Sequence, residues 1–420
     1  MSLRNTNTLN DTPSGERLHI GFFGIRNAGK SSVVNAVTNQ ELSLVSEVKG
    51  TTTDPVLKAM ELLPLGPVVI IDTPGIDDEG TLGELRVQRT REALRQCDVA
   101  VLVADATKGL QAADKELLAL FEERGVPHIV AFNKKDLADA PQTNTLPADA
   151  QVLTVSAKTG EGIEALKELL GKLAGEKQEK FILRDLVDPG DTVVLVIPID
   201  ASAPKGRIIL PQQQVLRELL DLHCNALCVQ ASDLKPLLDR LLQNDATKPK
   251  LVVTDSQAFK SVTKDTPADI PVTSFSILFA RYKGNLEQQV RGVAALRDLR
   301  PDSKVLISEG CTHHRQCQDI GTVKLPGWLE NYTGFPPKVT FTQGGRFPED
   351  LSPFDLIIHC GGCMLNEAEM QSRLKLAQIA EVPMTNYGVC IAEFHGTLAR
   401  ALEPFPAYAE LLNQKGDHYV

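Results

Sequence analysis

Apolar and polar residues alternate along this chain in a pattern that predicts short strands followed by amphipathic helices. Between residues 18 and about 174, apolar runs with strand character are separated by helical patterns, which is typical of a parallel α/β sheet. We expect strands at LHIGFFG, VVIIDTPG, VAVLVADA, HIVAFNKKD and QVLTVSA. The charged, glycine-containing stretch at 171–181 predicts a boundary after this first unit.

Two more units with the same alternation follow. Residues 185 to about 265 predict the strands DTVVLVIPI, LCVQ and LVVTD with helices between them. This second unit is too small for a deep core of its own, so we expect it to pair with another copy. For residues 272–420 the pattern predicts the strands VTSFSILF, KVLISEG, KVTFTQG, FDLIIHC and MTNYGVC, with helices at NLEQQVRGVAALRDL, EAEMQSRLKLAQIAE and FHGTLARALE.

The overall composition narrows the class of protein. Lys and Arg total 44 against 54 Asp and Glu, a net charge of −10 without any basic run, so binding to a nucleic-acid backbone is not favoured. No stretch approaches 18 consecutive apolar residues, which argues against a membrane span. The polar beginning lacks an apolar signal core, so we expect a disordered lead-in over 1–17 and a cytoplasmic protein. Eight cysteines in 420 residues are too few for a disulfide scaffold.

A phosphate-binding motif lies directly after the first predicted strand. GIRNAGKSS, residues 24–32, matches G-x-x-x-x-G-K-[ST] and precedes a helical pattern. Glycines let backbone amides approach phosphates, the lysine reaches the β- and γ-phosphates, and the following serine binds Mg²⁺. The expected nucleotide-binding residues of this loop are Gly24, Asn27, Ala28, Gly29, Lys30, Ser31 and Ser32.

Three later motifs identify the nucleotide as guanine. In DTPG, Asp72 is placed to hold the water shell of Mg²⁺, and the Gly75 amide to approach the γ-phosphate. In NKKD, Asp136 can accept hydrogen bonds from both N–H groups of guanine, a pattern that adenine does not present. SAK follows the last strand and offers a backbone amide to the guanine oxygen. The expected base-binding residues are Asn133, Lys134, Asp136, Ser156, Ala157 and Lys158.

These motifs resemble a translation-factor-class GTPase over residues 18–174, and in detail its TrmE/Era-like branch. GTTTD at 50–54 is similar to the switch motif GTTRD of that branch, which implies that Thr52 is the second Mg²⁺ ligand. In that branch an asparagine at the position of Asn27 accompanies a K⁺ ion; otherwise Asn27 is a turn residue that tolerates a left-handed backbone. Ile76 stands where Ras-like enzymes have the water-orienting glutamine, so we expect slow, switch-like hydrolysis, with Lys30, Thr52, Asp72 and Gly75 as its catalytic residues.

Two other apolar strands end in cysteine and histidine. SEGCTHHRQC at 308–317 follows KVLIS, and HCGGC at 359–363 follows FDLII. Carboxyl ends of parallel strands meet at one edge of a sheet, so Cys311, Cys360 and Cys363 can converge. The residues alone leave four possibilities open: a zinc site, an iron–sulfur site, a redox dithiol and cysteines that are simply buried in the core.

The combination of a GTPase of this branch, a small central unit and C-x-H…H-C-x-x-C resembles the HydF family of [FeFe]-hydrogenase maturation GTPases along essentially the whole chain. This resemblance implies that Cys311, Cys360 and Cys363 hold a [4Fe–4S] cluster, with His359 or His313 as the candidate fourth ligand. It further implies a homodimeric scaffold for a transient di-iron precursor, with radical-SAM maturases and apo-[FeFe]-hydrogenase as partners and with no nucleic-acid or membrane partner.

We therefore expect an α/β protein with three domains. They are an N-terminal P-loop GTPase domain with a mostly parallel sheet (18–174), a small α/β dimerisation domain (182–265) and a C-terminal α/β cluster-binding domain with a parallel sheet (270–420). The alternative is a zinc-stabilised regulatory GTPase of RNA modification or ribosome assembly, which the acidic charge balance argues against. We expect Cys97 and Cys390 to be buried in the core.

Overall fold

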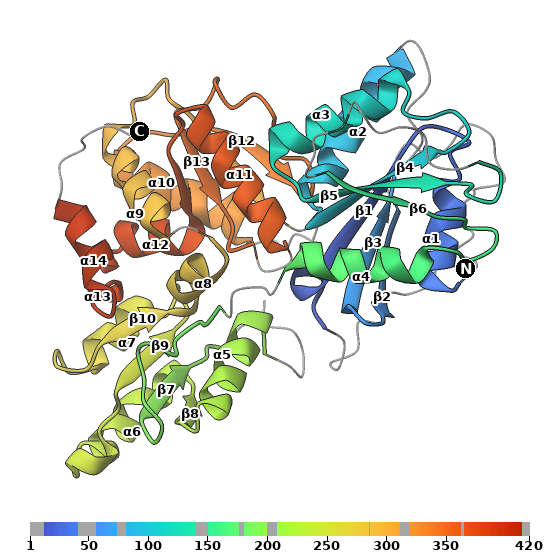
Figure 1. Cartoon of the computed structure of the whole chain (residues 1–420). Helices are drawn as coiled ribbons and strands as arrows, with labels where there is room; N and C mark the ends of the chain where they lie inside the picture. The colour runs from blue at the N-terminus through green and yellow to red at the C-terminus, as the bar shows by residue number, and fades with distance from the viewer. Residues whose placement is uncertain are drawn as a thin grey trace, which may run out of the picture. The chain divides into compact units, whose positions relative to one another are not determined.

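The structure, a computed structural model, forms two compact units, Met1–Glu179 and Lys180–Val420 (Figure 1). It describes residues 12–40, 56–73, 81–138, 146, 150–175, 180–199, 208–284, 286–310, 319–362 and 365–413.

The first unit is built on a six-stranded sheet in the order β2-β3-β1-β4-β5-β6. β2 is antiparallel to β3, and the other neighbours are parallel. The strands are β1 (Leu18–Phe23), β2 (Val56–Leu62), β3 (Gly66–Asp72), β4 (Val99–Asp105), β5 (His128–Asn133) and β6 (Gln151–Thr154). The helices are α1 (Lys30–Thr38), α2 (Thr81–Arg95), α3 (Ala112–Arg124) and α4 (Ile163–Ala174), with a short 3-10 helix at Ser14–Glu16.

Alternate side chains of the central strands fill the two faces of this sheet. On β4, Val99, Val101 and Val103 belong to one apolar cluster, whereas Ala100 and Leu102 belong to another. A strand buried on both faces reads as a continuous apolar run, which is why the sequence pattern predicted it.

The second unit contains two four-stranded sheets in which every pair of neighbours is parallel. Their orders are β10-β9-β7-β8 and β12-β11-β13-β14. The first sheet consists of β7 (Thr192–Val196), β8 (Asn225–Val229), β9 (Leu251–Thr254) and β10 (Val272–Ser274). The second consists of β11 (Lys304–Glu309), β12 (Lys338–Gln343), β13 (Leu356–His359) and β14 (Met384–Asn386).

Helices cover both sheets of this unit. They are α5 (Leu210–Asp221), α6 (Leu234–Leu241), α7 (Phe259–Asp265), α8 (Phe275–Lys283), α9 (Leu286–Ala294), α10 (Leu325–Thr333), α11 (Glu367–Ile379), α12 (Tyr387–Phe394), α13 (Leu398–Ala401) and α14 (Pro406–Ala409). Short 3-10 helices lie at Ala231–Asp233, Asp245–Thr247, Ala295–Asp298 and Glu410–Asn413, and a π-helix lies at Ile320–Lys324.

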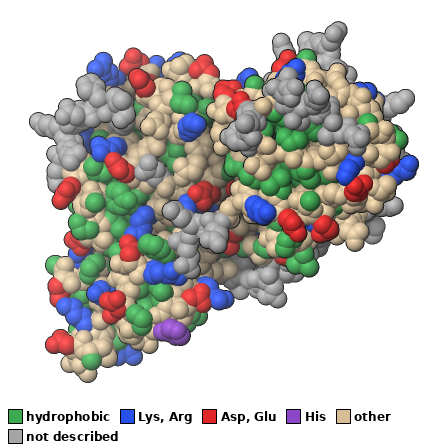
Figure 2. All heavy atoms as spheres, viewed as in Figure 1, with side chains coloured by type: hydrophobic (Ala, Val, Ile, Leu, Met, Phe, Trp, Pro, Cys, Tyr) green, Lys and Arg blue, Asp and Glu red, His purple; other side chains and the backbone are tan. Residues whose placement is uncertain are grey.

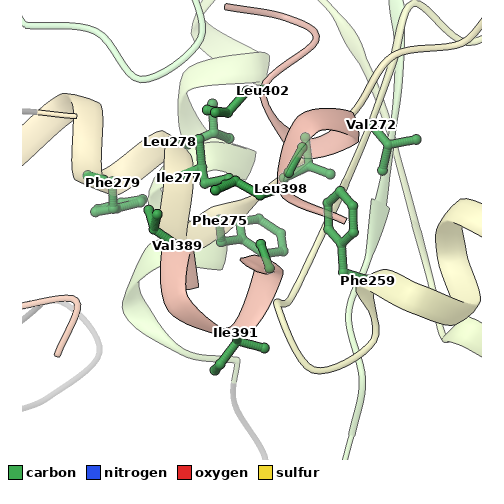
Figure 3. Packing of buried hydrophobic residues seen from close by; sticks show 14 of the residues in the cluster. Phe259, Val272, Phe275, Ile277, Leu278, Phe279, Val389, Ile391, Leu398 and Leu402 are labelled. Carbon is green, nitrogen blue, oxygen red and sulfur yellow. The ribbon is translucent and has the colours of Figure 1, made fainter. Parts of the chain in front are cut away.

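One apolar core joins the two sheets of the second unit. Figure 3 shows Phe259 of α7, Val272 of β10 and Phe275 of α8 packed near Val389 of α12 and Leu398 of α13. All five side chains are at most 2% exposed, so this contact is dry. The two sheets therefore share their packing.

The α/β fold class and its parallel sheets are confirmed, but two predicted strands are wrong in their second half. Residues 272–279 and 384–390 read as continuous apolar strands, yet each strand ends after three residues and a helix begins. Ser274 Oγ accepts a hydrogen bond from the backbone N–H of Ile277 at 3.2 Å, and Asn386 Oδ1 accepts one from Val389 at 2.8 Å. These N-caps start α8 and α12.

Other predicted elements shift less. The predicted helix at 394–403 is shortened to α13, because Gly396 adopts a left-handed φ of 67°. β2 and α10 have no counterpart among the predicted elements. β10 pairs with β9, which places 272–274 in the same sheet as β7, although the predicted third range begins at 270. The predicted domain ranges stay predictions.

Surface and core agree with the composition. Cys97 and Cys390 are buried, as predicted. Figure 2 shows Lys or Arg and Asp or Glu side chains interspersed over the visible face. In the described part of the chain, none of the helices has the length and apolar content needed to cross a membrane.

Candidate functional site

The phosphate loop joins β1 to α1 and needs glycine at two positions. Gly24 has a φ of 152°, and a Cβ on it would lie 2.4 Å from the carbonyl oxygen of Val103. Gly29 has a φ of 86°, and a Cβ on it would lie 2.2 Å from Nδ2 of Asn133. Any side chain at either position would therefore clash with the neighbouring strand ends.

Asn133 ends β5 and ties three segments of the site together. Its side chain is 3% exposed. Nδ2 donates to the carbonyl oxygen of Ala28 at 3.1 Å and to that of Gly29 at 3.5 Å, while Oδ1 accepts from the backbone N–H of Ala157 at 3.1 Å. The first residue of NKKD thus fixes both the phosphate loop and SAK.

Lys134 extends this hold by one residue. Its Nζ donates to the carbonyl oxygen of Asn27 at 3.0 Å, so Asn133 and Lys134 hold the carbonyls of residues 27, 28 and 29. In a trans peptide the N–H points opposite to the preceding C=O. The amides of Gly29 and Lys30 therefore face the other side of the loop, at the N-terminus of α1, where phosphate binds in such loops.

Lys30, which directly follows the phosphate loop, forms an ion pair with Asp72. Lys30 Nζ donates to Oδ1 of Asp72, which is the last residue of β3. Burial lowers the pKa of Lys30 to about 8. The two residues expected at the phosphates and at Mg²⁺ are thus brought into direct contact.

The carboxylate of Asp136, which is expected to recognise the base, is held by the SAK motif. The Ser156 hydroxyl donates to Oδ1 of Asp136 at 2.8 Å, and Lys158 Nζ lies 3.8 Å from Oδ2. Ser156 is fully buried, so its hydroxyl is a fixed support for the carboxylate. Ser31 and Ser32 lie in the first turn of α1. Thr52, Gly75 and Ile76 lie outside the described residues.

The second candidate site lies at the carboxyl ends of β11 and β13. Ser308 and His359 are in register, and the Cys360 N–H donates to the Ser308 carbonyl at 2.8 Å. Cys360 Sγ accepts from the backbone N–H of Gly310 at 3.0 Å and from that of Gly362 at 3.4 Å. The ends of β11 and β13 are adjacent, as the motif pattern predicted, and the sulfur of Cys360 accepts hydrogen bonds from two backbone amides.

The other predicted ligands at this edge are not described. Cys311 and His313 lie within 311–318, and Cys363 lies within 363–364, so these ranges stand outside the described residues. Among the described residues, no group of three or more His, Cys, Asp or Glu side chains is placed to hold a metal ion.

His359 has hydrogen bonds at both ring nitrogens. Nε2 lies 2.9 Å from Nη1 of Arg373, which can only donate, and Nδ1 donates to the Cys360 carbonyl at 2.7 Å. Burial, followed by the charge of Arg373, lowers the pKa of His359 to about 3, so the ring is neutral. To bind a metal through Nε2, His359 would have to give up its bond to Arg373.

The support for His359 was missed in the sequence. Arg373 is fully buried on α11; its Nε donates to Glu369 Oε1 at 2.8 Å and its Nη2 to the Gly344 carbonyl at 2.7 Å. Glu369 and Arg373 are four residues apart on one helix, which is a usual spacing for a surface ion pair. Their spacing alone therefore gave no sign that they are buried beside the cysteine loop.

Family models match three successive segments of the chain. Residues 19–134 match a model described as 50S ribosome-binding GTPase. Residues 182–284 match the hydrogen maturase F dimerization domain, and residues 287–404 match the hydrogen maturase F tetramerization domain. The first unit is therefore a P-loop GTPase domain that binds GTP and Mg²⁺, and the later matches support oligomerisation.

The curated relatives named MnmE match the GTPase region of this chain. The tRNA modification GTPase MnmE of Laribacter hongkongensis (strain HLHK9) is 33% identical over 174 residues, 40% of this chain and 38% of that protein. MnmE of Prochlorococcus marinus (strain MIT 9303) is 37% identical over 171 residues, 40% of this chain and 36% of that protein. The match thus spans well under half the length of these relatives.

Solved structures give a weaker likeness. A crystal structure of Era in complex with MgGDPNP and a segment of 16S ribosomal RNA has a TM-score of 0.33 and 21% identity, covering 50% of this chain and 93% of that chain. A probable GTP-binding protein engB has a TM-score of 0.31 and 24% identity, covering 38% of this chain and all of that chain (100%).

Proposed function

Because the chain belongs to the hydrogen maturase F family, we propose that it is a GTP-hydrolysing scaffold that carries the di-iron precursor of the [FeFe]-hydrogenase active site to the apo-enzyme. The observation that carries this proposal is the presence, in one chain, of a guanine-nucleotide site and both hydrogen maturase F segments. The radical-SAM maturases supply the precursor, and apo-[FeFe]-hydrogenase receives it. The protein acts as a homodimer in the cytoplasm, where a reducing environment keeps its thiols free.

The site around Cys360, at the carboxyl ends of β11 and β13, has chemistry that suits an iron–sulfur cluster. Cys360 Sγ accepts two backbone N–H groups, and cluster-bound thiolates commonly receive such hydrogen bonds. The two glycines that donate these hydrogen bonds, Gly310 and Gly362, directly precede Cys311 and Cys363 in the sequence. These three cysteines would hold a [4Fe–4S] cluster, which supplies one iron with an exchangeable ligand for attachment of the di-iron cargo.

His313 is the better candidate for the fourth ligand. His359 already uses both ring nitrogens and orients the carbonyl of Cys360. Pulsed EPR of the reduced cluster would test this assignment, since a bound imidazole gives a ¹⁴N coupling. We expect His313→Ala to abolish that coupling and His359→Ala to retain it; the reverse result would make His359 the ligand.

The nucleotide acts as a slow switch. Ser31 and Thr52 would bind Mg²⁺, and Asn27 would bind K⁺ near the phosphates, where a cation neutralises developing negative charge. Asn27 is exposed and has a left-handed backbone with a φ of 65°. We expect faster GTP hydrolysis in KCl than in NaCl, and expect Asn27→Ala to remove the difference without abolishing GTP binding.

Anaerobic reconstitution tests the scaffold itself. The purified chain would be incubated with iron and sulfide, and its metal content and EPR spectrum would be recorded beside a Cys311/Cys360/Cys363→Ala triple variant. About four irons and four sulfides per chain, with a reducible signal lost in the variant, would support the proposal.

Stoichiometric zinc that resists exchange, with no paramagnetic signal, would overturn the proposal that this protein binds an iron–sulfur cluster. That result would favour the zinc-stabilised regulatory GTPase instead. Loss of metal together with an alkylatable Cys360/Cys363 pair would point to a redox dithiol, because a bound cluster protects its cysteines from alkylation.

A further inference from the structure

Asp105 ends β4 and carries a buried carboxylate that belongs to none of the nucleotide motifs. It is 2% exposed. Oδ2 accepts from Lys134 Nζ at 2.6 Å, while Oδ1 accepts from the backbone N–H of Thr107 at 3.0 Å and from its hydroxyl at 2.6 Å. Burial raises the pKa of Asp105, but these hydrogen bonds outweigh burial and leave the pKa below its ordinary value. The group is therefore an ionised carboxylate with a defined partner on each oxygen.

The sheet brings Asp105 to the guanine motif. β4 and β5 are parallel neighbours, and Asp105 is in register with Asn133, the first residue of NKKD. The backbone N–H of Ala106 also donates to the Asn133 carbonyl at 2.9 Å. Asp105 therefore lies next to Asn133, the residue that directly precedes Lys134.

Lys134 is held between two acceptors on different segments. Its ammonium donates to Asp105 Oδ2 and to the carbonyl oxygen of Asn27. Its backbone has a φ of 71°, a left-handed conformation that a lysine rarely adopts without support. One ammonium therefore connects the end of β4 with the phosphate loop.

We propose that Asp105 is a positioning residue for guanine-nucleotide binding, which holds the Lys134 ammonium on the Asn27 carbonyl and so fixes the phosphate loop. The proposal rests on the GTP-binding function of this unit. Without the carboxylate, a long and strongly hydrated lysine side chain would turn towards solvent. The Asn27 carbonyl would then lose its partner, and the peptide planes of the loop would be less well fixed for phosphate.

Fluorescent GDP and GTP analogues measure this effect in the full-length protein. Asp105→Asn keeps the shape of the side chain and removes its charge. We expect this variant to bind both nucleotides about tenfold or more weakly, which is the loss typical of a hydrogen bond to a charged group. Thr107→Ala is the matched control, because it removes one hydrogen bond to the same carboxylate but leaves Oδ2 with Lys134; it should weaken binding much less.

A double-mutant cycle separates positioning from general stability. Lys134→Met should weaken binding at least as much as Asp105→Asn, and the double variant should be no weaker than Lys134→Met alone. Additive losses would overturn the proposal, as would unchanged affinity in folded Asp105→Asn. If Asp105→Asn does not fold, wild-type affinity in Lys134→Met would still overturn it. Failure of the wild-type chain to prefer guanine over adenine nucleotides would instead refute the proposed function.

Discussion

At the scale of single residues, the nucleotide site depends on two left-handed residues that are not glycine. Asn27 and Lys134 have φ values of 65° and 71°, and one hydrogen bond connects them. Such backbone conformations cost on the order of 1 kcal/mol each and persist where surrounding contacts fix them. Here Asp105 holds the side chain of Lys134, and Asn133 holds the carbonyl of Ala28, which directly follows Asn27.

The motif residues could be predicted from the sequence because their spacing is diagnostic. The supporting residues could not. Asp105 acquires its role from the register of β4 with β5, and Arg373 from burial beside His359, neither of which a spacing reveals. In both cases a charged residue that usually lies on the surface is buried by pairing.

Asp136→Asn should change the preferred base from guanine to xanthine. The amide offers a donor where the carboxylate accepts, which opposes the N–H groups of guanine and suits the additional carbonyl of xanthine. We expect GTP affinity to fall by at least about a hundredfold, because the buried polar groups of the site are left unmatched. Competition between GTP and XTP measures this change in base preference. Retention of wild-type GTP affinity in the variant would contradict the assignment of Asp136 to the base.

At the scale of elements, two helices begin inside apolar runs that read as strands. Short apolar runs do not distinguish a buried strand from a buried helix. The missed signals were the cap residues Ser274 and Asn386, each followed three residues later by the N–H that its side chain accepts from. The strand that precedes each cap was predicted correctly over its first three residues.

Gly292 allows α9 to approach β14, and its replacement should destabilise the second unit. A Cβ there would lie 2.2 Å from the carbonyl oxygen of Met384. Because backbone must move, we expect Gly292→Ala to lower the free energy of unfolding by about 1–3 kcal/mol. Gly327→Ala on α10 is the control, since its Cβ would meet nothing within 4 Å, and it should be neutral or stabilising. Equal urea midpoints for the two variants would contradict the close approach.

Asp114 closes the capping box of α3 and should give the first unit a pH-dependent stability. Its Oδ2 accepts from the backbone N–H of Gln111 at 3.0 Å, and burial raises its pKa above 3.8. The native state then holds the proton more tightly than the unfolded chain. This stabilisation is complete below 3.8 and is lost as the pH rises through the native pKa.

Asp114→Asn keeps an acceptor oxygen but does not titrate. We therefore expect the stability of the wild-type chain relative to this variant to fall between about pH 4 and about pH 7. Urea unfolding of both proteins at the two pH values measures the difference. A constant difference would mean that Asp114 has the same pKa in the folded and unfolded states.

At the scale of the whole molecule, the second unit packs as one body although two family segments compose it. Arg400 of α13 donates to the carbonyls of Pro267 (2.9 Å), Ala268 (3.1 Å) and Ile270 (2.8 Å), and Thr273 Oγ1 donates to the Ala401 carbonyl at 2.9 Å. The sequence predicted alternating elements in both segments, but packing between them depends on distant residues that periodicity does not connect.

Residues 180–420 alone should unfold in a single cooperative transition. A fragment of residues 287–420 should be largely unfolded, because it lacks Phe275 and Ile277 from the shared core. Calorimetry and circular dichroism would measure both. Two separate transitions in the longer fragment, or a folded shorter one, would contradict a common core.

The shared core also limits how the two segments can change over generations. Phe275 on one side and Leu398 on the other occupy the same dry volume, so an enlargement at one must be met by a reduction at the other. A segment taken from a distant relative would bring side chains shaped for a different counterpart. We therefore expect the oligomerisation segments to be inherited as a pair, while the GTPase domain, with cores of its own, is exchanged more freely.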